Sequence, residues 1–313
     1  MTAESLGVVV LAYGGGDQHA PLVEALLGED IPPSSVLIVH NPAQRGEPAP
    51  QPIGGCQVLQ AQRNLGYAGG MNLGIERMRR RRVDLVLLLT HDARLRPGAT
   101  QMLLEAAVRL PGYGVVAPAL VLAGSETPFS FGGFTRATGT NGHVRERPTP
   151  TAEGVFDCDW VDGGTMLIRM PVLDRVGGFD ERFWGYCEEA EFCLRVRRAG
   201  SGVGVVLDAV AEQAPGGAKR PGAWAYLLTR NGTEYARRAV GLRAVFVVTL
   251  RTAWLVAFEL LRALVRITRL RPGGAAEPLA VAVGTARGSL DYFRGHWGPP
   301  PADLPGMGDL HNA

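Results

Sequence analysis

The chain has 313 residues, of which 46% are hydrophobic and 20% are charged, and its formal net charge is +2. This composition is typical of a folded globular protein and excludes a largely disordered chain. The small net charge argues against a protein that wraps nucleic acid. The four cysteines form no CxxC pair, which disfavours a zinc ribbon or a disulfide framework and indicates reduced thiols in a cytosolic protein.

The N-terminal part of the chain alternates strand and helix signals. Apolar, β-branched runs predict strands at residues 7–12, 36–39, 57–61 and 83–89. Amphipathic patterns between and after them predict helices at residues 20–27, 71–82 and 100–109. This alternation is typical of an α/β protein with a mostly parallel central sheet flanked by helices. Ligands of such sheets bind at the carboxyl ends of the strands.

After Val115 the pattern changes. Residues 123–157 are rich in Gly, Thr, Pro and Ser, which indicates a loop or an irregular β segment, and a short strand is expected at 165–168. Helices are predicted at residues 171–176, 188–198, 223–238, 242–269 and 278–294. We therefore expect a domain over residues 1–240, a helical C-terminal extension over 241–298 and a flexible tail over 299–313.

The sequence shows neither a signal peptide nor an uninterrupted membrane span. The start lacks a basic region, and charged residues interrupt the apolar stretch 244–264, so a transmembrane helix is disfavoured. The predicted helix 242–269 carries arginines among bulky apolar residues. Such a helix is suited to peripheral contact with an anionic membrane, to packing on the preceding domain or to forming a homodimer, and we favour packing or dimerisation.

Polar residues and glycines follow the predicted strands. Tyr13, Asn41 and Asp92 each come at or just after a strand, and the glycines of residues 66–70 follow the third strand. This set suits a nucleoside diphosphate: the tyrosine stacks on a base, the amide binds base or ribose, the glycines allow close backbone approach, and the carboxylate holds a divalent cation.

Each of these features also has a purely structural interpretation. Tyr13 is equally typical of an aromatic at the rim of a core, and Asn41 before a proline is an ordinary turn residue. The glycine stretch also suits a strand-to-helix connection, and Asp92 suits a helix cap. The joint occurrence of the four features favours the ligand-binding hypothesis.

Several longer motifs occur in a specific order: RNLGYAGGMNLGI (63–75), VLLLTHDARLRPG (86–98) and GGFDERFWGYCEEAEF (177–192). With them the chain resembles family 2 glycosyltransferases of the GT-A fold, in particular the rhamnosyltransferase-like and galactofuranosyltransferase-like branch. The resemblance covers residues 7 to about 240. It implies a Rossmann-like GT-A domain that binds a nucleotide sugar and carries out catalysis over residues 1–240.

The resemblance also implies site residues. Those expected to bind the donor are Ala12, Tyr13, Asn41, Asn64, Gly66, Ala68, Gly69, Asn72, His91, Asp92 and Arg230. Those expected where donor sugar and acceptor meet are Trp160, Asp162, Gly163 and Trp184. The implied catalytic acids are Glu188, Glu189 and Glu191, with Glu189 as the base. Asp92 is implied as ligand of Mg²⁺ or Mn²⁺.

The chain departs from the family pattern at four positions: Gly14 replaces an Asn, His40 replaces an Asp, Thr90-His91-Asp92 replaces the usual acidic metal motif, and Gln213 stands where a metal-binding His is common. The metal ligand that this His supplies in the family therefore has no counterpart at position 213, and His91 is an alternative ligand. We favour the interpretation of His91 as a structural neighbour of Asp92 over that of a ligand, because adjacent residues of an extended strand point to opposite faces.

The resemblance implies an inverting, metal-dependent glycosyltransferase that moves a sugar, for example rhamnose, from a dTDP- or UDP-sugar to a hydroxyl. The acceptor is a lipid-linked saccharide of the cell envelope or a small natural product. The protein is expected in the cytoplasm or at the inner face of the cell membrane. One alternative is a catalytically impaired nucleotide-sugar-binding protein of the same fold. A dinucleotide-dependent oxidoreductase is excluded, because its GxGxxG fingerprint is incomplete here. The glycines at 14 and 16 would require a third glycine at position 19, which is His19.

Overall fold

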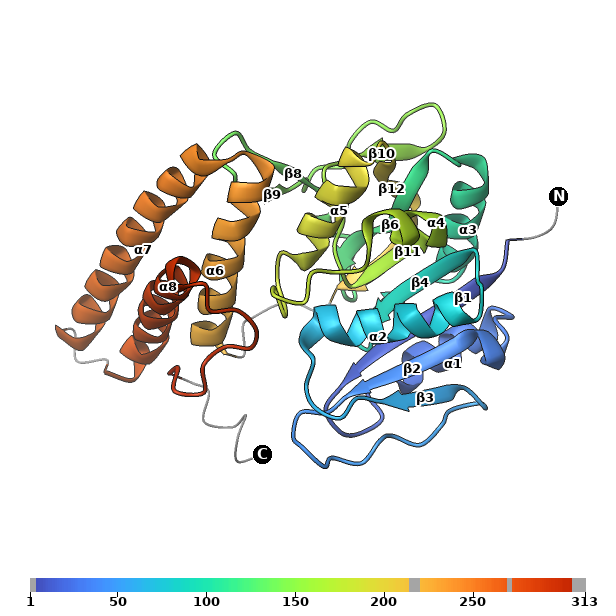
Figure 1. Ribbon diagram of the computed structural model, residues 1–313, viewed down its shortest axis with the longest axis horizontal. Helices are drawn as coiled ribbons and strands as arrows, with labels where there is room; N and C mark the ends of the chain where they lie inside the picture. The colour runs from blue at the N-terminus through green and yellow to red at the C-terminus, as the bar shows by residue number, and fades with distance from the viewer. Residues whose placement is uncertain (1–3, 214–219, 269–271, 306–313) are drawn as a thin grey trace. The chain divides into compact units, whose positions relative to one another are not determined.

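A computed structural model describes residues 4–213, 220–268 and 272–305, and within them one large sheet dominates the first part of the chain (Figure 1). Its strands are β1 (Leu6–Tyr13), β2 (Val36–Asn41), β3 (Gln57–Gln60), β4 (Leu85–Thr90), β5 (Arg94–Leu95), β6 (Tyr113–Leu122), β7 (Pro128–Ser130), β10 (Val155–Asp157), β11 (Thr165–Arg169) and β12 (Gly202–Gln213). Two further strands, β8 (Gly133–Thr135) and β9 (Asn141–His143), form a separate pair.

The main path of the sheet runs β10-β12-β6-β11-β4-β1-β2-β3. Strands β3, β2, β1 and β4 are parallel neighbours, and β6 and β12 are parallel to each other. Strand β11 is antiparallel to both β4 and β6 and so joins the two parallel groups. The expected mostly parallel sheet is confirmed, with β11 as the antiparallel strand at its centre.

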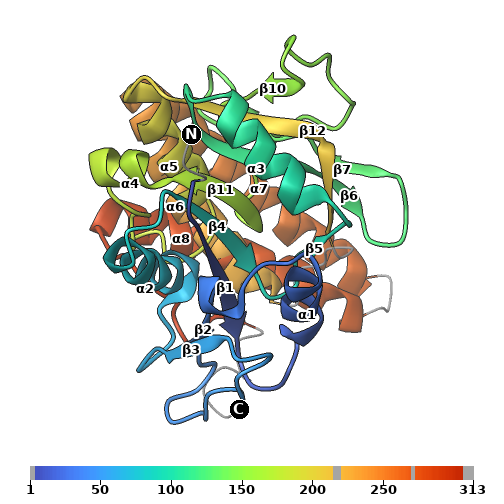
Figure 2. The ribbon, with the colours of Figure 1, turned by 90° about the vertical axis from the view of Figure 1, so that its right-hand side faces the viewer.

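Helices cover both faces of the sheet. They are α1 (Ala20–Gly28), α2 (Gly66–Arg80), α3 (Ala99–Arg109), α4 (Met170–Val176) and α5 (Glu188–Arg198). Side chains of β1 alternate between the faces: Val8 and Val10 pack in the core with α1 and α3, whereas Val9 and Leu11 face α2. Figure 2 shows α1 and α3 on one side of the sheet and α2 and α4 on the other.

Three further helices, α6 (Pro221–Ala239), α7 (Leu242–Thr268) and α8 (Ala276–Arg294), pack against one another (Figure 1). A short 3₁₀ turn, η2 (Pro272–Ala275), precedes α8, and another, η1 (Pro33–Ser35), precedes β2. Together with residues 135–141 and 181–188 these helices form a second compact unit, while the main sheet forms the first. The domain boundary at residue 240 stays a prediction. Of the expected flexible tail, Leu304 is buried, and residues 306–313 lie outside the described residues.

Two strands and one helix start differ from the sequence-based expectation. Strands β6 and β12 lie outside the expected strands, although both are long and contain several valines. Helix α2 begins at Gly66 instead of residue 71, because the glycines that disfavour a helix by propensity are needed there for packing. A Cβ on Gly70 would stand 2.5 Å from Leu11 Cδ1, and one on Gly74 would overlap Val9.

Candidate active site

Three strand ends bring polar residues to one edge of the sheet. Tyr13 at the end of β1 is in register with Asn41 at the end of β2. On the other side of β1, Leu11 is in register with Thr90 at the end of β4, and the backbone N–H of His91 donates to the carbonyl of Leu11 at 3.0 Å. The structure therefore brings the ends of β1, β2 and β4 together, as the predicted parallel sheet requires.

The side chains at this edge differ in exposure. Asp92, just beyond β4, is exposed, and both Tyr13 and His91 are half-buried. Ala12 is buried. Asp92 and Tyr13 are thus available to a ligand from solvent, whereas Ala12 can contribute only through its backbone.

Asn41 is held by the turn that starts α2. Its Nδ2 donates to Asn64 Oδ1 at 3.1 Å and to the Gly66 carbonyl at 3.0 Å, and its Oδ1 accepts the Leu65 N–H at 2.8 Å. Asn64 Oδ1 also accepts the N–H of Gly66 at 2.9 Å. Gly66 has a φ of 69°, a conformation that favours glycine. Both asparagines therefore shape the glycine turn, and the amide of Asn41 is used by the protein itself.

The next residues of α2 face the sheet or the site. Ala68 and Gly69 are buried in the helix that packs on β1. Tyr67 points elsewhere: its hydroxyl donates to the carbonyl of Gly163 at 2.5 Å, and its ring meets Phe179 edge-on with 5.5 Å between centroids. Sequence reasoning did not single out Tyr67, although it lies inside the glycine motif and is the only aromatic residue there.

Glu189 lies beside this same contact. A Cβ built on Gly163 would stand 3.0 Å from Tyr67 Oη and 3.5 Å from Glu189 Cβ. The following residue, Gly164, accepts the backbone N–H of Thr90 at 3.0 Å, two residues before Asp92. The segment 163–164 thus connects the end of β4 with the start of α5. Asp92 follows two residues after Thr90, and Glu189 lies next to Gly163.

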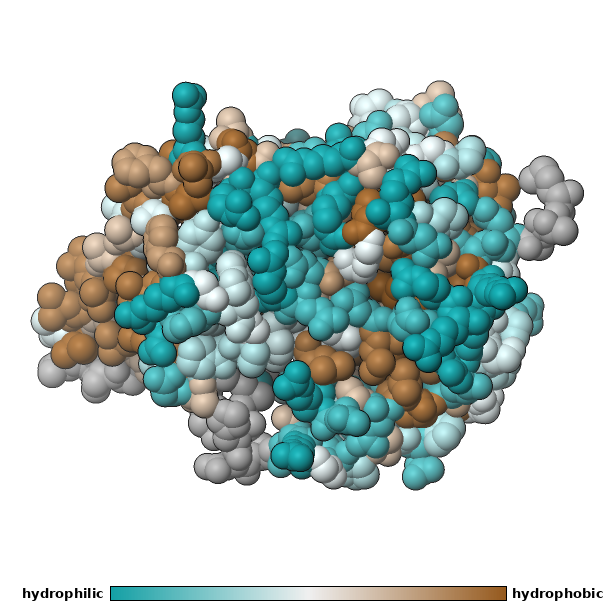
Figure 3. Space-filling model, in the orientation of Figure 1, coloured by the Kyte–Doolittle hydropathy of each residue, from teal (hydrophilic) through white to brown (hydrophobic). Residues whose placement is uncertain are grey.

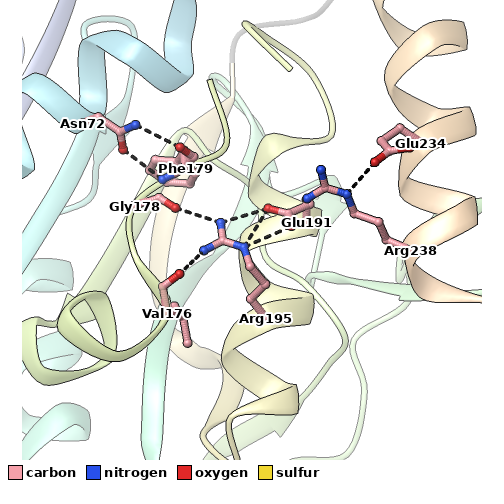
Figure 4. A network of polar contacts seen from close by, with 8 residues as sticks. All are labelled: Asn72, Val176, Gly178, Phe179, Glu191, Arg195, Glu234 and Arg238. Carbon is pink, nitrogen blue, oxygen red and sulfur yellow. Dashed lines mark hydrogen bonds and ion pairs between the residues drawn. The ribbon is translucent and has the colours of Figure 1, made fainter. Parts of the chain in front are cut away.

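The turn between α4 and α5 is held by polar contacts from Asn72 and Arg195 (Figure 4). Asn72 donates to the Phe179 carbonyl at 2.9 Å and accepts the Phe179 N–H at 2.8 Å. Arg195 binds Glu191 through Nε at 2.9 Å and 3.0 Å, and it also donates to the carbonyls of Val176 and Gly178. Glu191 is 1% exposed. Arg195 and Glu191 form an i,i+4 ion pair on α5, and both Asn72 and Glu191 support the turn from within the protein.

Asp162 and Trp160 precede the glycines of the site. Asp162 lies 3.6 Å from His143 Nδ1, and burial raises the pKa of Asp162 while His143 and a hydrogen bond with Ser130 oppose this. A largely buried carboxyl with a raised pKa is a candidate for proton transfer. The Trp160 ring is buried against Gly133 and stacks edge-on with His143, so it supports Asp162 rather than offering a surface.

The remaining expected site residues belong to the second unit. Trp184 packs against the buried cluster of Tyr226 and Leu227, and Glu188 is buried at the end of the segment 181–188. Arg230 is fully buried, and its guanidinium donates to the Gly298 carbonyl at 2.8 Å and to the Phe183 carbonyl at 3.3 Å. Arg230 therefore holds the backbone of this unit, which differs from the donor contact that the resemblance implies.

Asn231 is a structural residue that the sequence reasoning did not assign. Its Nδ2 lies 2.7–2.9 Å from the carbonyls of Phe183, Gly185 and Tyr186. Three residues of this segment that are not glycine, Trp184, Tyr186 and Cys187, have φ between 63° and 69°. Such conformations are rare for L-residues and persist only where the surroundings impose them. Asn231 fixes the carbonyls that this backbone path presents.

Asp92 is the residue at which the resemblance implies a divalent cation. A cavity of about 310 Å³ beside Asp92 also contains Glu212, but Glu212 lies 3.4 Å from Arg96 Nε and is partly neutralised. Within residues 4–213, 220–268 and 272–305 there is no cluster of three His, Cys, Asp or Glu side chains that could enclose a metal. One exposed carboxylate fits a cation that takes its other oxygens from phosphates and water, as Mg²⁺ does at substrate diphosphates.

Known proteins resemble the chain in sequence. No family model matches it. An N-acetylglucosaminyl-diphospho-decaprenol L-rhamnosyltransferase of Mycobacterium tuberculosis is 27% identical over 225 residues, which are 62% of this chain and 71% of that protein. Rhamnosyltransferase WbbL of Escherichia coli is 45% identical over 42 residues, 13% of this chain and 16% of the relative.

Solved structures resemble the fold. GalNAc-T7 with UDP, GalNAc and Mn²⁺ matches with a TM-score of 0.55 and 10% identity over 81% of this chain, which spans 57% of that protein. Mannosyltransferase PcManGT from Pyrobaculum calidifontis with GDP-Man and Mn²⁺ matches with a TM-score of 0.51 and 13% identity over 92% of this chain and 87% of the other. The relatives and the shared fold confirm that the chain is similar to rhamnosyltransferase-like glycosyltransferases of family 2 and that its fold is GT-A.

Proposed function

We propose that the protein transfers a sugar, rhamnose being the first candidate, from a dTDP- or UDP-sugar to a hydroxyl of a lipid-linked saccharide, with inversion at the anomeric carbon. The observation that carries this proposal is the approach of Glu189 to Gly163, next to the strand end that bears Asp92. The rhamnose and the lipid-linked acceptor are proposed from the activity for which the Mycobacterium tuberculosis relative is named.

The donor half of the site is proposed at the ends of β1 and β4. Tyr13 is half-buried there, which suits a ring that stacks on a nucleotide base. Asp92 is exposed and would hold Mg²⁺ or Mn²⁺ together with the donor diphosphate. Such a cation, when bound, offsets the negative charge that grows on the leaving diphosphate. Both structural relatives named above were solved with Mn²⁺.

The acceptor half is proposed around Glu189. Its carboxylate takes the proton of the acceptor hydroxyl while the oxygen forms a bond to the anomeric carbon. The bond from that carbon to the phosphate oxygen breaks, and its electron pair leaves with the nucleoside diphosphate. A base on the face opposite the leaving group yields inversion, and a positioned base contributes roughly 10²–10⁴-fold to the rate.

Tyr67 and Asp162 are proposed to shape this half. Tyr67 fixes the carbonyl of Gly163, so that the backbone beside Glu189 keeps its position. Asp162 is the second carboxyl near the acceptor, and its raised pKa suits a group that donates a hydrogen bond to the sugar. The reaction is proposed at the cytoplasmic face of the cell membrane, where a water-soluble donor meets a lipid-linked acceptor.

The test combines donor binding with transfer. The melting temperature of the purified chain is measured with UDP, dTDP, GDP and their sugars, with and without Mn²⁺. Rhamnosyl transfer to N-acetylglucosaminyl-diphospho-decaprenol is then measured for the wild type and for Glu189→Gln. We expect a shift with dTDP or UDP that grows with Mn²⁺, and a loss of transfer of at least about 10²-fold in the variant.

Two outcomes would contradict the proposal in different ways. Full transfer by Glu189→Gln would show that another group is the base. Donor binding without transfer to any saccharide acceptor would favour a binding protein of the same fold. The matched control is Glu24→Gln on the exposed side of α1, which is expected to keep both donor binding and transfer.

A further inference from the structure

Helix α7 exposes a long apolar surface. By helical periodicity, Phe246, Leu250, Trp254, Leu261 and Leu264 fall on one side of the helix, and all five are exposed, Trp254 to 64%. The helix has 27 residues, which corresponds to a length of about 40 Å. Figure 3 shows hydrophobic side chains gathered over this helix. An exposed patch of this extent marks an interaction surface.

The opposite side of α7 is packed. Its buried residues are Ala244, Val245, Glu259 and Ala263, and the helix contacts both α6 and α8. Small side chains at this side let the helices approach closely. The exposed surface is therefore part of a three-helix unit and is presented by a helix that is held along one side.

The charged side chains of α7 that are exposed to solvent are all positive. Arg243 and Arg251 are exposed, and Arg262 and Arg266 are partly exposed. The only acidic residue of the helix, Glu259, is 5% exposed and is paired with Arg262 at 2.8 Å. The surface thus combines bulky apolar side chains with cations, which complements an anionic lipid surface.

Two aromatic residues lie in the middle of this surface. Trp254 and Phe258 stack with 5.3 Å between their centroids and an angle of 11° between their planes, and both are exposed. Arg262 lies over the Phe258 ring at 5.9 Å. Aromatic rings beside arginines are favoured at the boundary between acyl chains and headgroups, where the ring is buried and the cation stays near phosphate.

The same features argue against a helix that crosses the bilayer. Leu242–Thr268 is long and apolar enough to do so by composition alone. However, Arg251 lies near the middle of α7 itself, and Arg287 lies near the middle of α8, which packs on α7. A spanning α7 would draw these charges into hydrocarbon, which is costly. A helix that lies in the membrane interface keeps them in water.

A second copy of the chain is also less suited to this surface. A self-complementary contact through α7 would bring arginines of both copies to a surface whose exposed charges are all positive. We propose that the exposed side of α7 is a membrane-docking surface that lies in the headgroup region of an anionic bilayer, with Trp254 and Phe258 inserted at the acyl boundary. This inference does not depend on the proposed catalytic roles.

The test is co-sedimentation of the full chain with vesicles of phosphatidylcholine alone or with phosphatidylglycerol added. We expect binding to the anionic vesicles to be at least about tenfold tighter and to weaken as salt is raised. Arg251→Glu and the double variant Trp254→Ser/Phe258→Ser are each expected to weaken binding by about tenfold or more. Circular dichroism checks their folding, and Arg251→Glu alone is decisive if the double variant does not fold.

Matched controls lie on α3, on the other unit. Arg109→Glu reverses one exposed charge, and the double variant Met102→Ser/Val108→Ser removes two exposed apolar side chains. Both control variants are expected to leave vesicle binding unchanged. The proposal is overturned if neither vesicle binds, or if the controls weaken binding as much as the α7 variants do. It is also overturned by a dimer in light scattering that the α7 variants dissociate, or by protein that resists alkaline extraction from vesicles as a spanning helix does. Thermal shifts with nucleotide, unchanged in the α7 variants, show that a failure here leaves the proposed function untouched.

Discussion

The acidic residues of the candidate site lie in two different surroundings. Asp92 is exposed at the end of β4, whereas Glu191 on α5 is almost fully buried and bound to Arg195. Glu189, two positions before Glu191, is half-buried beside Gly163. All three belong to stretches that carry the family resemblance. The difference teaches that the stretches which carry the resemblance combine residues that are open to solvent with residues that hold the backbone in place.

The two glutamates of α5 test this comparison with the same change. In Glu191→Gln, Arg195 keeps its place but loses its charged partner, so we expect a loss of about 2–3 kcal/mol in the free energy of unfolding. Glu189→Gln is expected to leave this free energy within about 0.5 kcal/mol. Urea denaturation of both variants measures the difference. Equal destabilisation of the two would contradict the division between scaffold and ligand-facing acids.

A second test concerns the glycine motif on α2. In Gly74→Ala the new methyl group overlaps Val9 and approaches Val39, so we expect a loss of about 1–3 kcal/mol from overpacking. Gly28→Ala at the end of α1 is the control, since a Cβ there meets no atom within 4 Å. Its unfolding free energy is expected to be unchanged or slightly raised. A neutral Gly74→Ala would show that α2 can move away from the sheet.

Asn72 is the third residue that distinguishes scaffold from ligand contact. Asn72→Ala removes both hydrogen bonds to the backbone of Phe179, and we expect a loss of about 1–2 kcal/mol in stability. Gln101→Ala on the exposed side of α3 is the control and should change stability by less than about 0.5 kcal/mol. A stable Asn72→Ala with weakened donor binding would restore the role in the donor site that the resemblance implies.

The smallest effect is expected at Asp162. Burial raises the pKa of Asp162 in the folded state above its unfolded value of about 3.9. At pH values between these two pKa values, the folded protein therefore binds more protons than the unfolded chain. Stability therefore falls as pH rises through this window. Asp162→Asn removes this titrating group. The unfolding free energy of the variant should therefore rise relative to that of the wild type as the pH increases above about 4. Parallel pH profiles of the two proteins would contradict the assigned direction.

The sequence predicted the outline of the sheet because its central strands are continuous apolar runs. Strands β1 and β4 are buried on both faces, and such runs are a strong signal. Strand β6 is less evident from the sequence because it contains Pro118, although Pro111-Gly112 marks the turn between α3 and this strand. The antiparallel place of β11 between β4 and β6 depends on contacts distant in sequence, which local patterns do not encode.

The position of the candidate site was predictable from the sequence, but the contacts of its individual residues were less so. The predicted strand ends placed Tyr13, Asn41 and Asp92 at one edge of the sheet, and the register of β1 with β2 and β4 confirms this placement. The amide of Asn41 forms hydrogen bonds with residues 64–66. Motif spacing does not predict these bonds, because they depend on the backbone path of the glycine turn. The burial of Arg230 likewise follows from the packing of α6 within the second unit.

The segment 181–188 has a consequence for any attempt to divide this protein. Asn231 and Arg230, both on α6, donate hydrogen bonds to its carbonyls, although the segment leads directly into Glu189. A shortened chain that ends after β12 would keep every strand of the sheet and still lose these donors. We expect such a chain to fold its sheet but to leave the entry to α5 without a defined path. Exchange of the C-terminal helices between related proteins would therefore have to carry residues 181–188 along with them.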